Sequence, residues 1–292
     1  MLLVFMLQSQ LNEILDSHEL WVKDSSKGKK ADLSYQDLSG LDFSNRNLSF
    51  IMMRRAKLSR ANFENANLFE AEFSFASLYS ASFLNSNLSN ANLSSANLSS
   101  ANLSSAGLTY ADLFYANLSN ANLSFANLFK ATLFKANLSY ANLSYVNLSN
   151  ASLSYANISG TVFYCTEFSC SKIDNLDFSR FSICPEEGQF YGFKKVQDDF
   201  ILKILISKHA KRLNSVSCRN CRASKVNVVE AFNLDGSKTN QIKFRSIFDP
   251  NFIYEVGKWI EVKDFNDDIQ EIDVPGIHFF LTKKEAIQYR VS

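Results

Sequence analysis

The sequence predicts a β-rich repeat protein, a solenoid that bends every five residues, followed by a small α+β domain. A large apolar residue recurs every fifth position from Leu33 to Ile183, which gives about 31 consecutive repeats. A small residue, usually alanine, stands two positions before it, as at Ala56 and Ala156. The five-residue period ends near Pro185, where the composition shifts toward Lys, Asp, Val and Ile.

The repeat unit itself indicates how the chain turns. A period of five fits neither the 3.6-residue period of a helix nor the two-residue period of a strand. One large and one small apolar position per unit suit a chain that bends at each repeat and points the same two side chains inward. The 292 residues include only nine glycines and three prolines, so ordinary residues must form the bends. The units read ADLSY, QDLSG, LDFSN and RNLSF from Ala31, and ANLSS further on.

These A-(D/N)-L-x-x units resemble the pentapeptide-repeat family over residues 31–184. The resemblance implies a right-handed quadrilateral β-helix with four repeats per coil. Residues 20 positions apart would then share a corner or a face. At a spacing of about 4.8 Å between coils, seven to eight coils would form a rod roughly 37 Å long.

Residues 1–30 are expected to cover the first coil, because an open coil edge invites aggregation. Apolar residues recur there at helical spacing, and we predict a capping helix over about residues 5–22 and a linker over 23–30. The residues that carry this spacing are Leu7, Leu11, Ile14 and Leu15. The apolar start at residues 1–6 is too short for a signal peptide and lacks a basic region.

Residues 185–292 are predicted to form the small α+β domain. Strand-like runs cover residues 201–206, 225–232, 252–262 and 277–281, and a short helix is expected over 282–289. The segments 192–195, 210–212, 221–224 and 276–282 resemble an uncharacterised domain that follows pentapeptide repeats in proteins of bacteria, phages and large DNA viruses. That resemblance implies no biochemical activity.

Composition excludes several classes of protein. Thirty basic and 29 acidic side chains give a net charge of +1, which makes nucleic-acid binding and attachment to anionic lipid unexpected. No run reaches about 18 apolar residues, so we expect no transmembrane helix. The cysteines are odd in number and irregularly spaced, which favours free thiols in a reducing cytoplasm, or in the host cell cytosol if the protein is viral. They are Cys165, Cys170, Cys184, Cys218 and Cys221.

The sequence offers no enzyme, cofactor or metal site. Glycine-rich phosphate-binding motifs are missing. Cys218 and Cys221 have the spacing of half a zinc site or a redox pair, with His209, His278 or a distant cysteine as further zinc ligands, but structural thiols are the favoured interpretation. His278 lies in an apolar run, where a single histidine is more often a core residue than a catalytic one.

Two groups of residues are candidates for contact with a partner. Aromatic residues gather in outward repeat positions, either as a contact surface or only as stacks that stabilise neighbouring coils. They are Phe114, Tyr115, Phe125, Phe129, Phe134, Tyr145 and Tyr155, with Lys135 among them. In the second domain, a basic run could meet an anion or an acidic partner, although acids elsewhere in the fold are expected to neutralise it. Its candidate contacts are Lys211, Arg212, Arg219 and Arg222.

The leading hypothesis is a non-catalytic interaction scaffold, with the rod as a rigid platform and the second domain as the part that selects an unknown protein partner. The family resemblance implies an alternative, a DNA mimic that modulates a type II topoisomerase. Mimicry requires a strongly negative rod, whereas residues 31–184 hold ten acids against nine bases. Ice binding is a third hypothesis, but the rod lacks regular threonine ladders. The oligomeric state is left open.

Overall fold

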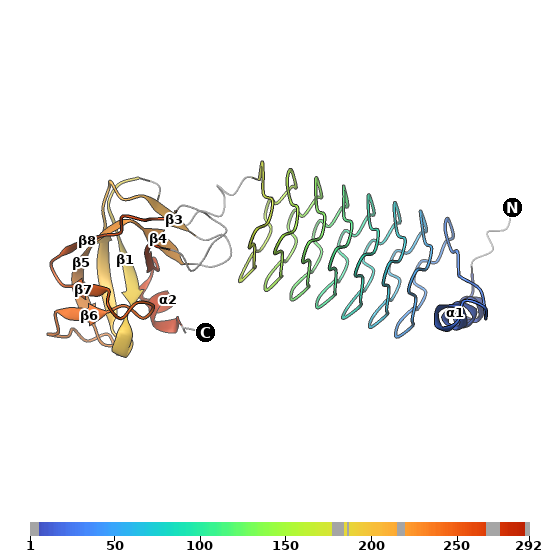
Figure 1. Ribbon diagram of the computed structural model, residues 1–292, viewed down its shortest axis with the longest axis horizontal. Helices are drawn as coiled ribbons and strands as arrows, with labels where there is room; N and C mark the ends of the chain where they lie inside the picture. Colours follow the sequence, from blue (N-terminus) through green and yellow to red (C-terminus); the bar gives the residue numbers. More distant parts are fainter. Residues whose placement is uncertain (1–5, 177–183, 186, 215–219, 267–274, 290–292) are drawn as a thin grey trace. The chain divides into compact units, whose positions relative to one another are not determined.

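A computed structural model describes residues 6–176, 184–185, 187–214, 220–266 and 275–289 (Figure 1). The chain divides into two compact units, Met1–Asp177 and Phe178–Ser292. This division precedes the predicted domain boundary at 184/185. In the described residues, no helix is both long and apolar enough to cross a membrane.

The first unit is a stack of coils that each take 20 residues (Figure 1). The second residue of each repeat forms a parallel bridge with the residue 20 positions later, from Asp32↔Met52 to Ser152↔Lys172. Backbone hydrogen bonds join each coil to the next, as where the Leu113 N–H donates to the Thr132 carbonyl at 2.8 Å. Four repeats therefore make one coil. The hand of the coil stays a prediction.

The interior of the coils holds the two apolar residues of each repeat. The large residue is buried from Leu33 to Phe168, and the preceding small residue is buried in nearly every repeat. Rings in neighbouring coils stack, and the centroids of Phe63 and Phe83 lie 4.9 Å apart. The inner column becomes half-buried at Ile173, and its predicted last member, Ile183, lies outside the described residues.

The corners of the coil are turns built without glycine in all but two repeats. From Tyr35 to Asn175 the fifth residue of each repeat lies in the left-handed region, with φ of 59° at Ser100, and the Ala101 N–H closes the turn on the Leu98 carbonyl at 3.0 Å. The second residue prepares the turn, because Asn97 Oδ1 accepts the Ser99 backbone N–H at 3.1 Å and its hydroxyl at 2.7 Å. Asn or Asp followed by Ser thus supplies the local hydrogen bonds that a bend needs.

Asparagines also link the coils through their side chains. Asn137 Nδ2 donates to Asn117 Oδ1 at 3.1 Å, and Asn117 Nδ2 donates to Asn97 Oδ1 at 3.3 Å. Asn117 and Asn137 therefore each accept a bond within their own turn and donate one to the preceding coil. The recurrence of Asn at the second position follows from these two roles.

Helix α1 (Gln8–Lys23) covers the first coil, slightly later in the chain than the predicted 5–22. Gln8 Nε2 donates to the Asp42 carbonyl and Gln8 Oε1 accepts the Asp42 N–H, both at 2.8 Å. Glu19 Oε1 accepts the Asn47 N–H at 2.8 Å. In later coils the backbone N–H groups at the same repeat position donate to the preceding coil. The Asn62 N–H, for example, donates to the Leu41 carbonyl. Side chains of α1 therefore replace the missing coil.

The second unit is built of three antiparallel sheets and a short helix (Figure 1). The largest has the order β1-β2-β5-β8, formed by Phe190–Lys195, Ile201–Ile206, Lys225–Phe232 and Trp259–Glu261. The second has the order β3-β4-β9, formed by Arg212–Asn214, Cys221–Ala223 and Ile277–Phe279. The third pairs β6 (Lys243–Arg245) with β7 (Ile253–Glu255), while η2 (Gln197–Asp199) follows β1 and α2 (Lys283–Gln288) follows β9. Buried side chains from all three sheets form the core, among them Leu202, Phe279 and Phe244.

Some elements of this unit differ from the prediction. The strands at 201–206 and 225–232 are present with the predicted bounds. The predicted strand over 252–262 is wrong, because Gly257 with a φ of 82° breaks it into β7 and β8. Strand β9 ends at Phe279, before the predicted end at 281. The final helix begins after Thr282, whose hydroxyl accepts the Glu285 N–H at 3.3 Å as an N-cap.

Candidate functional site

The main group of exposed aromatic residues lies at one corner of the repeat unit, here named the Tyr115 corner: Phe114, Tyr115, Phe134, Lys135 and Tyr155. The Phe114 and Phe134 rings stack with centroids 5.7 Å apart and planes 7° apart. Phe134 contacts Tyr155 with ring centroids 5.5 Å apart, and Lys135 Nζ donates to the Tyr115 hydroxyl at 2.8 Å. The group therefore spans three successive coils as one connected cluster.

The other predicted aromatic residues form two further corners. Phe125 and Tyr145 stack with centroids 4.8 Å apart and planes 3° apart, and Tyr164 lies 5.3 Å from Tyr145. The ring centroids of Phe129 and Tyr110 lie 6.2 Å apart, and Lys130 Nζ donates to the Tyr110 hydroxyl at 3.2 Å. The eight candidate residues thus belong to three corners and not to a single surface.

The sequence-based set omitted Tyr110, Lys130 and Tyr164, although the first two are 20 residues apart and that spacing could have identified them. The same spacing adds Arg55 and Phe75 to the column of the Tyr115 corner, nearer the N-terminus. The Arg55 guanidinium lies 4.9 Å from the centroid of the Phe75 ring. A cation over an aromatic ring therefore recurs along this column.

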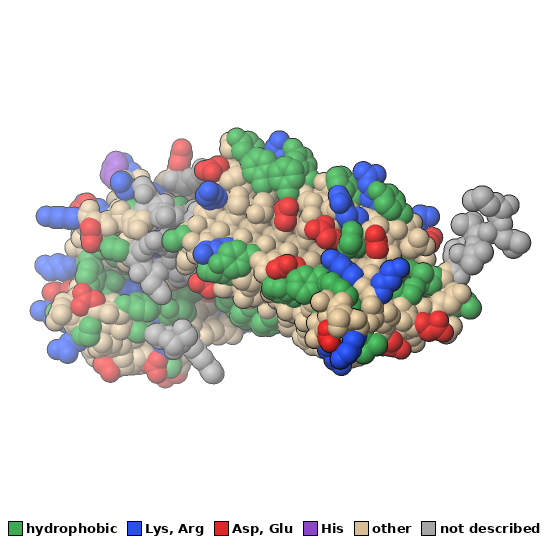
Figure 2. Space-filling model, turned by 45° about the vertical axis from the view of Figure 1, so that its right-hand side comes forward, with side chains coloured by type: hydrophobic (Ala, Val, Ile, Leu, Met, Phe, Trp, Pro, Cys, Tyr) green, Lys and Arg blue, Asp and Glu red, His purple; other side chains and the backbone are tan. Residues whose placement is uncertain are grey.

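The surface around the three corners is polar and almost uncharged. Asp112, Lys130 and Lys135 are the only charged residues between positions 74 and 160. Figure 2 shows hydrophobic side chains gathered in separate patches, with acidic and basic side chains scattered between them on one face of the molecule. In the part of the chain that the structure describes, neither lysine pairs with a carboxylate. Each instead lies over rings, and Lys135 Nζ is 5.2 Å from the centroid of Tyr115.

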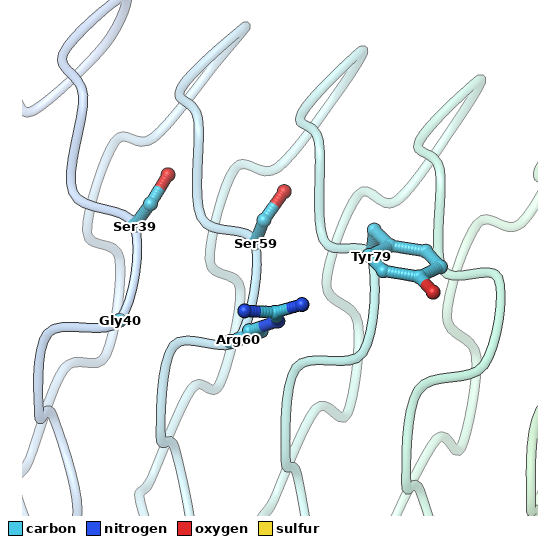
Figure 3. A pocket seen from close by; sticks show the side chains of 5 residues that line it. All are labelled: Ser39, Gly40, Ser59, Arg60 and Tyr79. Carbon is cyan, nitrogen blue, oxygen red and sulfur yellow. The ribbon is translucent and has the colours of Figure 1, made fainter.

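A hollow of about 360 Å³ lies at another corner, nearer the N-terminus (Figure 3). It is lined by Ser39, Gly40, Ser59, Arg60 and Tyr79. The Ser39 and Ser59 hydroxyls point the same way from equivalent positions of successive coils (Figure 3). Repetition of the coil accounts for this arrangement, which brings together one cation and no acid.

Of the described arginines in the predicted basic contact group, Arg212 bonds within the fold and Arg222 is buried. Arg222 is only 1% exposed, in β4 between β3 and β9. Lys211 is exposed, and Arg219 lies outside the described residues. The Arg212 guanidinium donates to five backbone carbonyls, those of Pro185, Gly188, Ser207, Lys208 and Ala210.

Two other cations of the basic run pair with acidic side chains, in line with the expectation that acids elsewhere in the fold neutralise the run. Lys225 Nζ lies 2.8 Å from a carboxylate oxygen of Glu261, and Lys203 Nζ lies 3.8 Å from one of Glu230. Both pairs cross between neighbouring strands of the largest sheet. The charge of the run is therefore partly neutralised by residues distant in the sequence.

Both described cysteines of the second unit, Cys184 and Cys221, are buried. Cys221 is fully buried in the apolar core, and Cys218 lies outside the described residues. A hydrogen bond with Cys221 lowers the pKa of the Cys184 thiol. Within the described ranges no three His, Cys, Asp or Glu side chains are grouped as a metal site would require. His278 lies in β9, with its ring 6.2 Å from that of Phe248.

Three of the solved structures that match this chain have low TM-scores, and two of them are pentapeptide repeat proteins. The coil protein HetL, involved in heterocyst differentiation regulation in the cyanobacterium Nostoc sp. strain PCC 7120, is 27% identical, with 50% of this chain and 84% of that chain covered and a TM-score of 0.32. The protein alr5209 from Nostoc PCC 7120 is 32% identical, with coverage of 32% and 79% and a TM-score of 0.30. QnrB1, a plasmid-mediated fluoroquinolone resistance protein, is 22% identical, with coverage of 52% and 81% and a TM-score of 0.29. None of the curated proteins matches the chain.

Comparison with protein families accounts for both units. Pentapeptide repeats (8 copies) match in overlapping segments between residues 47 and 180. A family of unknown function (DUF5758) matches residues 180–286. The repeat match agrees with the 20-residue stacking of the coils. The chain therefore belongs to the pentapeptide-repeat family and carries a separate C-terminal DUF5758 domain.

Proposed function

We propose that this protein is a non-catalytic interaction scaffold, in which a right-handed four-sided coil presents aromatic corners to a protein partner. The DUF5758 domain would then add selectivity for that partner. The observation that supports the proposal best is the Tyr115 corner, a connected cluster of rings that stays open to solvent.

Stacking accounts for only part of this cluster. Aromatic pairs contribute about 0.5–1.5 kcal/mol beyond the burial of their area, so the rings stabilise the coils that they bridge. Yet Phe114 is 40% exposed, Tyr115 is 47% exposed and Tyr155 is 54% exposed. Aromatic residues of this kind supply much of the binding energy when a partner buries them.

The charge of the corner indicates what the partner carries. Lys135 is exposed, and its ammonium pairs with no carboxylate among the described residues. An acidic side chain of a partner could reach it beside the rings. The proposal is therefore a protein surface that presents apolar side chains next to at least one carboxylate.

Affinity purification from the native host tests the proposal, with the full chain as bait and quantification of each captured protein. The double variant Phe114→Ser/Phe134→Ser should lose the specific partner by tenfold or more, because two anchoring rings are removed. The circular dichroism spectrum should be unchanged, since serine is the commonest residue at these positions.

The matched control is Tyr79→Ser/Tyr140→Ser, which removes two exposed rings from a different corner. It should capture the partner as the wild type does. Equal capture by all three proteins would refute a role for the Tyr115 corner. Equal loss in both variants would show that aromatic content alone, and not this corner, determines capture.

A further inference from the structure

The DUF5758 domain contains a pocket of about 370 Å³ that the scaffold function does not use. This volume lies in the lower part of the range for small-molecule sites. Its walls come from β1, β7, β9 and the segments around β6 and β8. They are Lys194, Ser246, Phe248, Asp249, Phe252, Tyr254, Val262, Asp264, Pro275, Gly276 and His278.

The unusual member of this lining is Lys194, which is 5% exposed. Its Nζ donates to the His278 carbonyl at 3.1 Å and lies 5.4 Å from the centroid of the Tyr254 ring. In the described part of the domain no carboxylate pairs with it. An ammonium has three N–H donors, so this hydrogen bond satisfies one of them. Burial disfavours the charged form and lowers the pKa of Lys194 to about 8.

The other lining groups divide into an apolar interior and an acidic rim. Phe252 and Tyr254 pack with ring centroids 5.1 Å apart, and the Tyr254 hydroxyl is hydrogen-bonded to Ser246. Burial raises the pKa of Tyr254, so this phenol is neutral at physiological pH. Asp249 and Asp264 are both exposed, and Asp249 Oδ1 accepts the Asn251 N–H at 2.9 Å.

We propose that this pocket captures a small aromatic aldehyde or ketone through a reversible imine with Lys194 Nζ. The neutral amine attacks the carbonyl carbon, a C–N bond forms, and the carbonyl π electrons pass to oxygen to give a carbinolamine. The C–O bond then breaks, and the oxygen leaves as water with the two hydrogens of the amine. One C=N bond has replaced one C=O bond, and no oxidant or reductant is needed.

Three features favour a carbonyl compound over an anion paired with an ammonium. With a pKa of about 8, roughly a quarter of the Lys194 amine is neutral at pH 7.5, against about one in a thousand for an ordinary lysine. Carboxylates at the rim repel an anionic ligand. The aromatic walls offer faces on which a planar ring can stack. The imidazole of His278 also lines the pocket, and Arg222 is its neighbour across the β4–β9 pair.

Reductive trapping on the full chain tests the proposal. The wild type is incubated at pH 7.5 with salicylaldehyde and cyanoborohydride, and the modified lysines are mapped by peptide mass spectrometry. Lys194 should be modified about tenfold faster than exposed lysines such as Lys258, because its neutral fraction is larger while its nucleophilicity is somewhat lower. Lys195 serves as an internal control on the same strand, since its Nζ lies 2.9 Å from a carboxylate oxygen of Asp199.

Two further measurements bear on the chemistry. Without reductant, the imine absorbance band should saturate with salicylaldehyde in the wild type and in Lys195→Met, and should be lost in Lys194→Met. Salicylate should bind much more weakly than the aldehyde. Modification of Lys194 no faster than that of Lys258 would overturn the proposal, and this result needs no variant. Binding of salicylate as tight as that of the aldehyde would overturn it too, in favour of an ion-pairing site.

Discussion

At the scale of single residues, His18 shows how one buried side chain joins α1 to the coil. It is fully buried, and its Nδ1 accepts the Ala31 N–H at 3.1 Å. This bond requires the unprotonated nitrogen, and burial lowers the pKa of His18. The apolar spacing of the helix predicted its buried face at Leu11 and Leu15 but not this histidine, because its partner is supplied by the first repeat.

The pH dependence of stability tests this role. A histidine whose pKa is lower in the folded state stabilises the fold above its unfolded pKa of about 6.5 and loses that contribution as the pH falls through the folded pKa. At pH 8, His18→Gln should lower the free energy of unfolding by about 1–2 kcal/mol. The difference from the wild type should shrink by pH 5, as measured by denaturant titration. His209→Gln, at an exposed position, is the control, and a gap that widens toward acid would contradict the assignment.

At the scale of elements, repeats and strands differ in how far sequence could predict them. Each repeat forms its turn with its own residues, so the five-residue period of the sequence was enough to predict the coil. The three-residue strands β3, β4 and β6 carry no such pattern, since they exist through pairing with distant segments, such as Cys221 with Phe279. The surroundings of two predicted basic contacts also depend on the fold, because sequence does not show that carbonyls converge on Arg212 or that neighbouring strands bury Arg222.

The asparagine ladder gives a prediction at this scale. Asn117→Ala removes the acceptor of the Ser119 N–H and both amide links to neighbouring coils, and should cost about 1–3 kcal/mol in thermal or chemical unfolding. Asn117→Asp keeps the acceptor of the Ser119 and Asn137 N–H groups but sets an oxygen against Asn97 Oδ1 in place of the donor, so its cost reports the link to the preceding coil. Asp112 makes the equivalent turn bond to the Phe114 N–H at 3.0 Å. A cost near zero for Asn117→Asp would show that the bond donated to the preceding coil contributes nothing to stability.

At the scale of the whole molecule, charge argues against mimicry of DNA. Residues 31–184 carry ten acids and nine bases, so the repeat unit lacks the field that a substitute for a polyphosphate needs. The aromatic candidates could be found from sequence because residues 20 apart share a corner. The Lys194 pocket could not be found in this way, since its lining joins position 194 to positions 246–278 through pairing of β1 with the end of β9.

Because residues 20 positions apart lie in adjacent coils, insertions and deletions decide which side chains meet on the surface. Deleting residues 86–105, one whole turn of Ser, Asn, Ala and Leu, leaves every later residue in its own column. Deleting residues 116–120 removes no aromatic ring but turns the following chain by one corner, so Phe114 meets Ser139 instead of Phe134. Both proteins should fold with the wild-type circular dichroism spectrum, and only the first should capture the partner. Capture by the second would show that the rings act singly. A deletion that removes no surface ring could thus change which rings lie next to one another.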